Sequence, residues 1–156
     1  MADTPPSVAE IAAEEEELQF TGFTNDDAWE LGTALVEAGR RDGAQIAIDI
    51  SRNSHQLFHA ALPGTSADND DWIRRKIAVV NRFGHSTLYM RQSFLERGTT
   101  FEEATGLALE GYAAHGGGFP ILVRNVGPVG VVVVSGLPQL EDHRMVVTAI
   151  RAQLAR

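Results

Sequence analysis

The chain has 156 residues, of which 44% are hydrophobic and 22% charged, so its size and composition are those of one ordinary globular domain. It contains no cysteine, which excludes disulfides, thiolate metal sites and cysteine nucleophiles. The net charge of −8 argues against nucleic-acid binding. The sequence has no run of about 20 apolar residues and no basic N-terminal signal. It therefore predicts a cytoplasmic protein that does not enter membranes.

The acidic charge is concentrated at the N-terminus. Residues 1–20 hold six acidic side chains and no basic one, whereas the rest of the chain is almost neutral. Ser7 is a suitable helix cap, and the glutamates at 14–17 form either a solvated helix face or a tail that contacts a partner. We expect residues 1–17 to be an acidic, partly disordered segment or helix and residues 18–156 to be a single domain, which opens with a short strand or docking segment.

A helix and a β-hairpin follow. Residues 25–42 follow a capping threonine, Thr24, carry two aspartates in their first turn and end before a glycine, which predicts an amphipathic helix. Residues 45–51 and 55–62 alternate between apolar and polar side chains, as in a hairpin. A three-residue turn would place Asp49 opposite His59, and a four-residue turn would not.

The stretch 57–92 is the densest in chemically capable side chains. Ser66 or Asp68 is expected to cap a helix that ends at Gly84, and Ser86 is expected to cap a second helix. Two acid-first pairs are spaced for ion pairing along the first helix, namely Asp70–Arg74 and Asp71–Arg75. Lys76 completes a basic triplet of which one member is expected to bind a carboxylate or phosphate, the others being solvated or paired.

The C-terminal third predicts a second hairpin and a last helix. Residues 106–118 are expected to be largely loop, and strands at 119–124 and 129–134 are joined by a turn. The sequence VGVVVV is almost continuously apolar, which is typical of a strand covered on both faces. The order helix, hairpin, two helices, hairpin, helix therefore predicts an α/β (α+β) protein with three layers.

Two motifs resemble a known family. The segment GGGFPILVRNVGPVGVVVVSG resembles the GlcG-like, or HbpS-like, family, whose pattern falls here on Gly117, Gly118, Pro120, Ile121, Gly130, Ser135, Gly136 and Asp142. The block PGTSADNDDWIRRK with RFGHS is similar to one bacterial and fungal subfamily without an agreed reaction. The resemblance covers about residues 18–155. It implies a profilin-like α/β/α fold with a five-stranded antiparallel sheet, homo-oligomers, and haem as a candidate ligand, without fixing an axial histidine.

Candidate ligand-binding residues come from three places. They are His59, Asp71, Arg75, Arg82, His85, His115, Gly116, Gly117, Gly118 and Phe119. His59, near a strand end, is a ligand or base, or a histidine bonded in a sheet–helix seam. One polar side of a helix, which is a ligand wall or a subunit contact, carries Asp71, Arg75, Arg82 and His85. The glycines after His115 form an anion nest or admit a flat ligand, or else they mark a strand entry too tight for side chains.

These features predict a small oligomeric protein that binds a small anionic ligand, with haem as the family-based candidate. One alternative is an enzyme, a lyase or oxidoreductase acting on a small anionic substrate, which needs a titratable pair in a pocket. The other is a non-catalytic assembly or adaptor protein that uses the acidic N-terminal helix as its contact. The sequence has no HExxH, P-loop or GxSxG motif and no regular spacing of histidines and carboxylates, so it predicts no metal site and names no catalytic residue.

Overall fold

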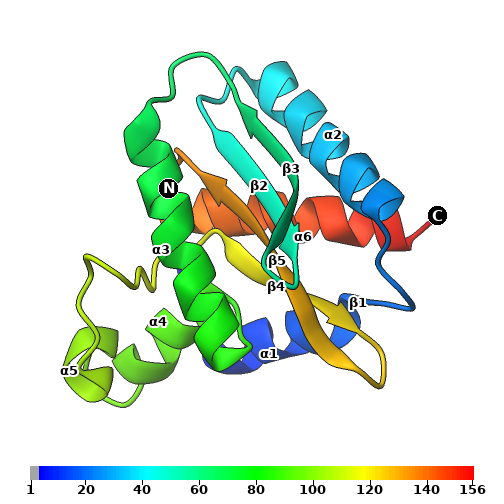
Figure 1. Cartoon of the computed structure of the whole chain (residues 1–156). Helices are drawn as coiled ribbons and strands as arrows, with labels where there is room; N and C mark the ends of the chain where they lie inside the picture. The colour runs from blue at the N-terminus through cyan, green and yellow to red at the C-terminus, as the bar shows by residue number, and fades with distance from the viewer. Residues whose placement is uncertain (1–3) are drawn as a thin grey trace.

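The computed structural model describes residues 4–156 (Figure 1). In chain order the elements are α1 (Val8–Glu17), β1 (Gln19–Phe20), α2 (Asn25–Asp42), β2 (Ala47–Arg52), β3 (His55–Ala61), α3 (Ala67–Phe83), α4 (Thr87–Leu95), α5 (Phe101–Thr105), β4 (Gly118–Val123), β5 (Gly127–Ser135) and α6 (Gln139–Leu154). The prediction of a partly disordered segment covers residues 1–17, of which residues 1–3 lie outside the described residues. Within the described part of the chain, no helix is long and apolar enough to cross a membrane.

The five strands form one sheet in the order β1-β4-β5-β2-β3. Both predicted hairpins are present, but the prediction of a wholly antiparallel sheet is wrong at one pair, because β1 runs parallel to β4. Hairpin turns force antiparallel pairing, whereas β1 reaches the sheet edge from α1 and has no turn that fixes its direction. The sheet is therefore mixed.

The β2–β3 turn differs from both lengths considered above. Asn53 and Ser54 both have positive φ, as in the tight two-residue turns of hairpins. A register shift between Ile50 and Ser51 compensates for the shorter turn, so Asp49 does lie opposite His59.

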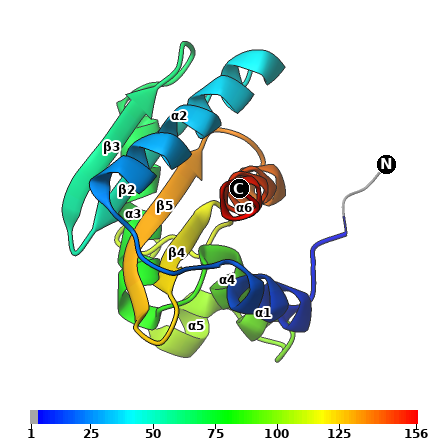
Figure 2. The ribbon, with the colours of Figure 1, turned by 90° about the vertical axis from the view of Figure 1, so that its right-hand side faces the viewer.

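Helices cover both faces of the sheet, as the continuous apolar strand predicts. α2 and α6 pack on one face and α3 on the other (Figures 1 and 2). The larger core lies under α2 and α6 and includes Leu35, Ile48 and Val132. The smaller core lies under α3, where Ile73 and Val80 meet the other side of β5. The three layers place the beginnings of α3 and α6 near the same end of the sheet.

The predicted limits of α3 are confirmed, and one of its predicted ion pairs is wrong. Ser66 caps the helix, and Gly84 ends it with φ of 72°. Asp71 binds both Arg74 and Arg75, at 2.8 and 3.0 Å. Asp70 turns instead toward the sheet, where its carboxylate lies 3.4 Å from His59 Nε2.

Candidate functional site

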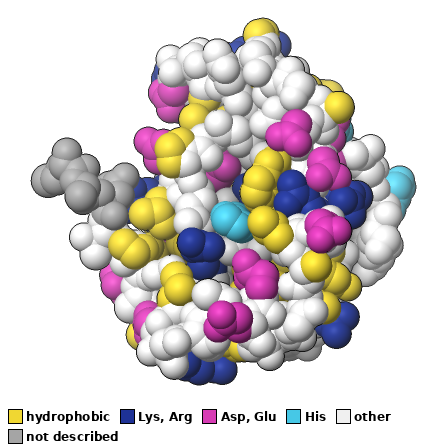
Figure 3. All heavy atoms as spheres, turned by 90° about the vertical axis from the view of Figure 1, so that its left-hand side faces the viewer, with side chains coloured by type: hydrophobic (Ala, Val, Ile, Leu, Met, Phe, Trp, Pro, Cys, Tyr) yellow, Lys and Arg dark blue, Asp and Glu magenta, His cyan; other side chains and the backbone are white. Residues whose placement is uncertain are grey.

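A cavity of about 290 Å³ lies between the first turns of α3 and α6 and the loop that precedes β4. We call it the α3–α6 cavity. Its lining residues are Asp68, Asn69, Trp72, Lys76, His115, Ser135, Gly136, Leu137, Gln139 and Asp142. On the face where α3, α4 and α5 lie, hydrophobic, basic and acidic side chains interleave, with histidine among them (Figure 3). The cavity thus combines ionisable groups with an aromatic wall.

A buried ion pair forms one wall of the α3–α6 cavity. Lys76 is 3% exposed, and its Nζ donates to the carbonyl oxygens of Gly116 and Val134 at 2.9 and 3.1 Å. The same Nζ lies 3.4 Å from Oδ2 of Asp142, whose Oδ1 accepts the amide of Leu137 at 3.0 Å. Burial raises the pKa of Asp142 to about 6 and lowers the pKa of Lys76, and in each case the partner's charge opposes the effect of burial.

Trp72, one turn before Lys76 on α3, contacts Arg75 and His115, and of these three side chains Trp72 and His115 line the cavity. The guanidinium of Arg75 lies 4.0 Å from the centroid of Trp72, and Trp72 meets the ring of His115 edge-on at 5.3 Å. Arg75 is fixed by Asp71 and by the carbonyl oxygen of Leu109. Burial, followed by the nearby positive charges of Arg91 and Lys76, lowers the pKa of His115, so its imidazole is neutral at neutral pH.

The glycines after His115 allow close packing. The amides of Gly116 and Gly118 are occupied by Gln139 Oε1 and Thr87 Oγ1, both at 3.0 Å. A Cβ on Gly117, which has φ of 131°, would lie 2.4 Å from the carbonyl oxygen of Val134. These contacts agree with the tight strand entry, and Phe119 is fully buried in the core. A ligand-binding role of these four residues stays a prediction.

His59 belongs to a different group on the other side of α3. Its Nδ1 lies 3.1 Å from Asp49 and its Nε2 3.4 Å from Asp70. Asp49 also accepts from Gln56, and burial raises its pKa. A cavity of about 550 Å³ borders this group and includes Arg74 in its lining. His59 and His115 therefore line different cavities.

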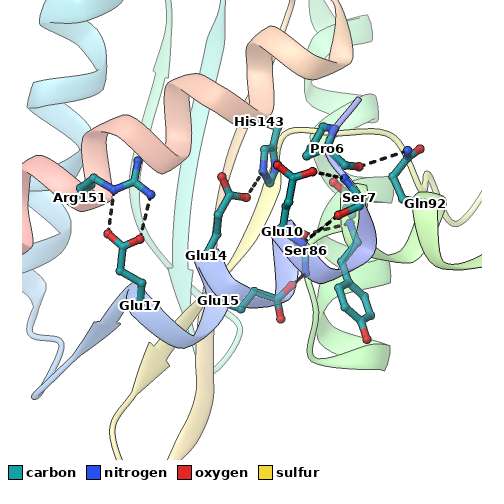
Figure 4. Close-up of polar contacts among 12 residues, drawn as sticks. Pro6, Ser7, Glu10, Glu14, Glu15, Glu17, Ser86, Gln92, His143 and Arg151 are labelled. Carbon is teal, nitrogen blue, oxygen red and sulfur yellow. Dashed lines mark hydrogen bonds and ion pairs between the residues drawn. The ribbon is translucent and has the colours of Figure 1, made fainter. Parts of the chain in front are cut away.

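His85 and His143 hold α1 in place, and Figure 4 shows His143 of α6 reaching Glu14 of α1. His85 Nδ1 lies 2.7 Å from Glu15, which raises the pKa of His85, and the second oxygen of Glu15 accepts the amide of Ser86. His143 Nε2 lies 2.8 Å from Glu14. Glu17 binds Arg151 of the same helix α6 through both carboxylate oxygens. The interpretation of this glutamate run as a solvated face is wrong for Glu14 and Glu15, which partners distant in the sequence reach in buried or half-buried positions, whereas Glu16 and Glu17 are exposed as predicted.

Of the residues predicted from sequence, the structure brings Asp71, Arg75 and His115 together around Trp72. Arg82 lies apart from them, against Tyr112, and His85 lies against α1. Trp72 and Asp142 were not among the predicted site residues, and Lys76 was predicted only as one member of the basic triplet. A signal for Lys76 was present, because it falls on the buried stripe of α3 between Ile73 and Val80.

Comparison with known proteins gives this arrangement a context. A family model described as "Haem degrading protein HbpS-like" matches residues 23–151. The chain belongs to the HbpS-like family. It is 56% identical over 149 residues to a UPF0303 protein of Streptomyces coelicolor, covering 96% of this chain and 94% of that relative. The family resemblance predicted from the sequence is confirmed.

Solved structures show the same fold. The crystal structure of the yeast protein Ybr137w has a TM-score of 0.86 and 36% identity, covering 96% of this chain and 88% of that one. The crystal structure of a PduOC:Heme complex has a TM-score of 0.70 and 17% identity, covering 84% of this chain and 94% of the other. At that identity the likeness concerns the fold alone.

Haem, which the family description suggests, does not fit inside the α3–α6 cavity. Ligand pockets range from roughly 300 to 1,000 Å³, so a cavity of about 290 Å³ lies at the small end. A porphyrin is a large ligand for this volume. Its two propionates are negatively charged, and so are the carboxylates of Asp68 and Asp142 in the lining, so their charges would repel each other. The dimensions suit a molecule of a few heavy atoms.

Proposed function

We propose that this chain binds a small anionic organic molecule in the α3–α6 cavity. The observation that carries the proposal is the buried Lys76–Asp142 pair in the cavity wall. A buried ion pair stabilises a fold no better than well-packed apolar side chains, and often less well. Its position beside a cavity, with shifted pKa values on both partners and on His115, supports a ligand site.

The helix ends at the cavity favour an anion. The first amides of a helix point outward with partial positive charge and bind carboxylates and phosphates readily. The first turns of α3 and α6 both border the cavity, and within residues 4–156 no side chain caps α6. Lys76 offsets the negative charge of Asp142. A carboxylate on the ligand would meet donors at the α6 end, and the ligand body would lie against Trp72.

The two tryptophans provide the test. Trp72 lines the cavity, whereas Trp29 lies on α2 and is 63% exposed. In Trp29→Phe, Trp72 is the only tryptophan, and we expect a saturable fluorescence change on titration with at least one of acetate, lactate and pyruvate. In the matched Trp72→Phe variant, the remaining Trp29 should not respond. The same response in both variants, or none in Trp29→Phe, would contradict the proposal.

A haemin titration distinguishes binding of a small anion in the α3–α6 cavity from the haem binding that the family description suggests. We expect His115→Ala to leave the Soret spectrum of a haemin titration unchanged, because haem exceeds the cavity. A Soret shift that is present in the wild type and lost in His115→Ala would show instead that haem reaches this wall.

We also propose that copies of the chain assemble with one another. The strand β3 forms an edge of the sheet, and Trp29 is the largest side chain among the exposed hydrophobic ones. Unpaired strand edges and exposed aromatic side chains are typical contact surfaces. Native mass spectrometry should give a multiple of the chain mass, and Trp29→Arg should shift the population toward the monomer; a wild-type monomer alone would contradict assembly.

A role of the acidic helix as an adaptor surface receives less support. Glu14, Glu15 and Glu17 are engaged by side chains of the same molecule. A partner that required Glu14 and Glu15 would first have to break their contacts with His143 and His85.

A further inference from the structure

Lysine occurs once in this chain. Twelve of the thirteen Lys and Arg residues are arginine, and the single lysine is Lys76. Arginine serves ion pairs and hydrogen bonds at least as well, but its guanidinium does not lose a proton in proteins, whereas a buried lysine does so readily. The one position that carries lysine is thus also a buried position in a cavity wall.

The surroundings of Nζ suit a reactive amine. Its contacts are the carbonyl oxygens of Gly116 and Val134 and the carboxylate of Asp142. A Cβ on Gly117 would lie 2.6 Å from Nζ, so only a glycine here lets the amine approach the backbone this closely. Asp142 is both the nearest acid and a lining residue of the cavity.

We propose that Lys76 forms an imine with the carbonyl carbon of a small anionic carbonyl compound, of the 2-oxo acid class, held in the α3–α6 cavity. The proposal rests on the ligand-binding function above and names the ligand class. Lysine amines that form imines in proteins are activated by removal from water or by a charged neighbour. Lys76 is buried, and the positive charge of Arg75 also lowers its pKa, whereas Asp142 opposes the shift.

The protons balance through Asp142. Its carboxylate takes a proton from the ammonium of Lys76, and the free amine attacks the carbonyl carbon, so that a C–N bond forms and the carbonyl electron pair moves to oxygen. That oxygen takes the proton from Asp142, which then removes a second proton from nitrogen. Asp142 returns this proton to the hydroxyl group, the C–O bond breaks, and water leaves. The net change is ammonium plus carbonyl to protonated imine plus water, with no oxidant or reductant.

The electrostatics favour the first step. Burial lowers the pKa of Lys76 and raises that of Asp142 to about 6, so both shifts reduce the cost of moving a proton from the ammonium to the carboxylate. His115 adds no second positive charge beside the protonated imine, because burial lowers its pKa.

Reductive trapping tests the proposal in the wild-type protein. The protein is incubated at neutral pH with sodium cyanoborohydride and either pyruvate or propionaldehyde, then digested and analysed by mass spectrometry. Lys76 carries the only side-chain primary amine of this sequence, so the α-amine at the start of the chain serves as an internal control. We expect a reduced adduct on the Lys76 peptide with pyruvate. An adduct with pyruvate alone would show that the ligand carboxylate is recognised, and one with propionaldehyde alone would contradict the anionic ligand class. Adducts on the terminus only, with both probes, would overturn the proposal.

Asp142→Asn separates chemistry from architecture. The amide oxygen still accepts the Leu137 amide, but it no longer takes a proton from Lys76, so trapping should slow about tenfold or more. Unchanged trapping would overturn the role of Asp142. A saturable Trp72 response to pyruvate without an adduct on Lys76 would overturn imine formation and leave the ligand-binding function standing. Lack of both would overturn the two together.

Discussion

Two neighbouring residues of α6 belong to regions with opposite character. His143 faces α1 and binds Glu14, whereas Asp142 lines the α3–α6 cavity and binds Lys76. Both pairs join segments far apart in the sequence, and both bury ionisable groups. The α1 contacts cross a seam between helices, where they fix one helix on the others. The Lys76–Asp142 pair lies instead where a ligand could reach it. Burial of an ion pair therefore does not by itself identify a functional site. What distinguishes the two pairs is whether a cavity lies beside them.

The largest effect is expected from breaking the cavity pair on one side. Asp142→Leu leaves the Lys76 ammonium buried without its carboxylate, so the free energy of unfolding should fall by about 3–5 kcal/mol. The double variant Lys76→Met/Asp142→Leu has no uncompensated charge and should regain about 2 kcal/mol or more of that loss. Urea unfolding of both variants measures this. A double variant no more stable than Asp142→Leu would show that the pair is not coupled.

The contact between α1 and α6 should cost less to break. Glu14→Ala removes the partner of His143 Nε2, and among the described residues the other ring nitrogen already has none. An unsatisfied buried group costs about 1–3 kcal/mol, which urea unfolding would report.

Glu16→Ala is the matched control on the same helix. Glu16 is exposed, and its side chain accepts only a long bond of 3.4 Å from Gln19, so the change in stability should stay within about 0.5 kcal/mol. Ligand binding should be unchanged in both glutamate variants. Equal losses for Glu14→Ala and Glu16→Ala, or loss of the Trp72 response in either, would remove the distinction between the two regions.

The smallest expected effect is a pH dependence of the stability with which α1 is held on the rest of the chain. Glu15 raises the pKa of His85 above 6.5, so this contact contributes fully below that pH and is lost as the pH rises through the raised value. His85 is 41% exposed, so the contribution is less than about 1 kcal/mol. Hydrogen exchange of α1 amides, corrected for the intrinsic rate, should become faster from about pH 6 to pH 8 in the wild type, and His85→Gln should abolish the trend. Protection that increases with pH, or a trend that survives in His85→Gln, would contradict this assignment.

Local signals explain why most of the fold could be predicted. Thr24 and Ser66 cap helices, and Gly43 and Gly84 end them. The alternation of apolar and polar residues in two segments joined by a short turn predicts that they pair as β2 and β3. The direction of β1 could not be predicted, because two residues carry no pairing signal and α1 determines how they reach β4.

The candidate site was predicted only where one segment contained the evidence. His115 stood out beside its glycines, and Asp71 and Arg75 share a helix. Lys76 and Asp142 are separated by 66 positions, and their meeting depends on how α3 and α6 pack on opposite faces of the sheet. Glu14 reaches His143 from 129 positions away, so no local pattern predicts that contact.

The state of Lys76 tests the central claim most directly. With one lysine in the chain, protein labelled with ¹³C at lysine Cε gives one lysine signal, whose shift during a pH titration reports the pKa of this amine alone. The cavity site predicts a midpoint below the ordinary lysine value of 10.5 and a change in the signal when pyruvate is added. A midpoint at or above 10.5, with no response to pyruvate, would mean that Lys76 is an ordinary ammonium held for structure.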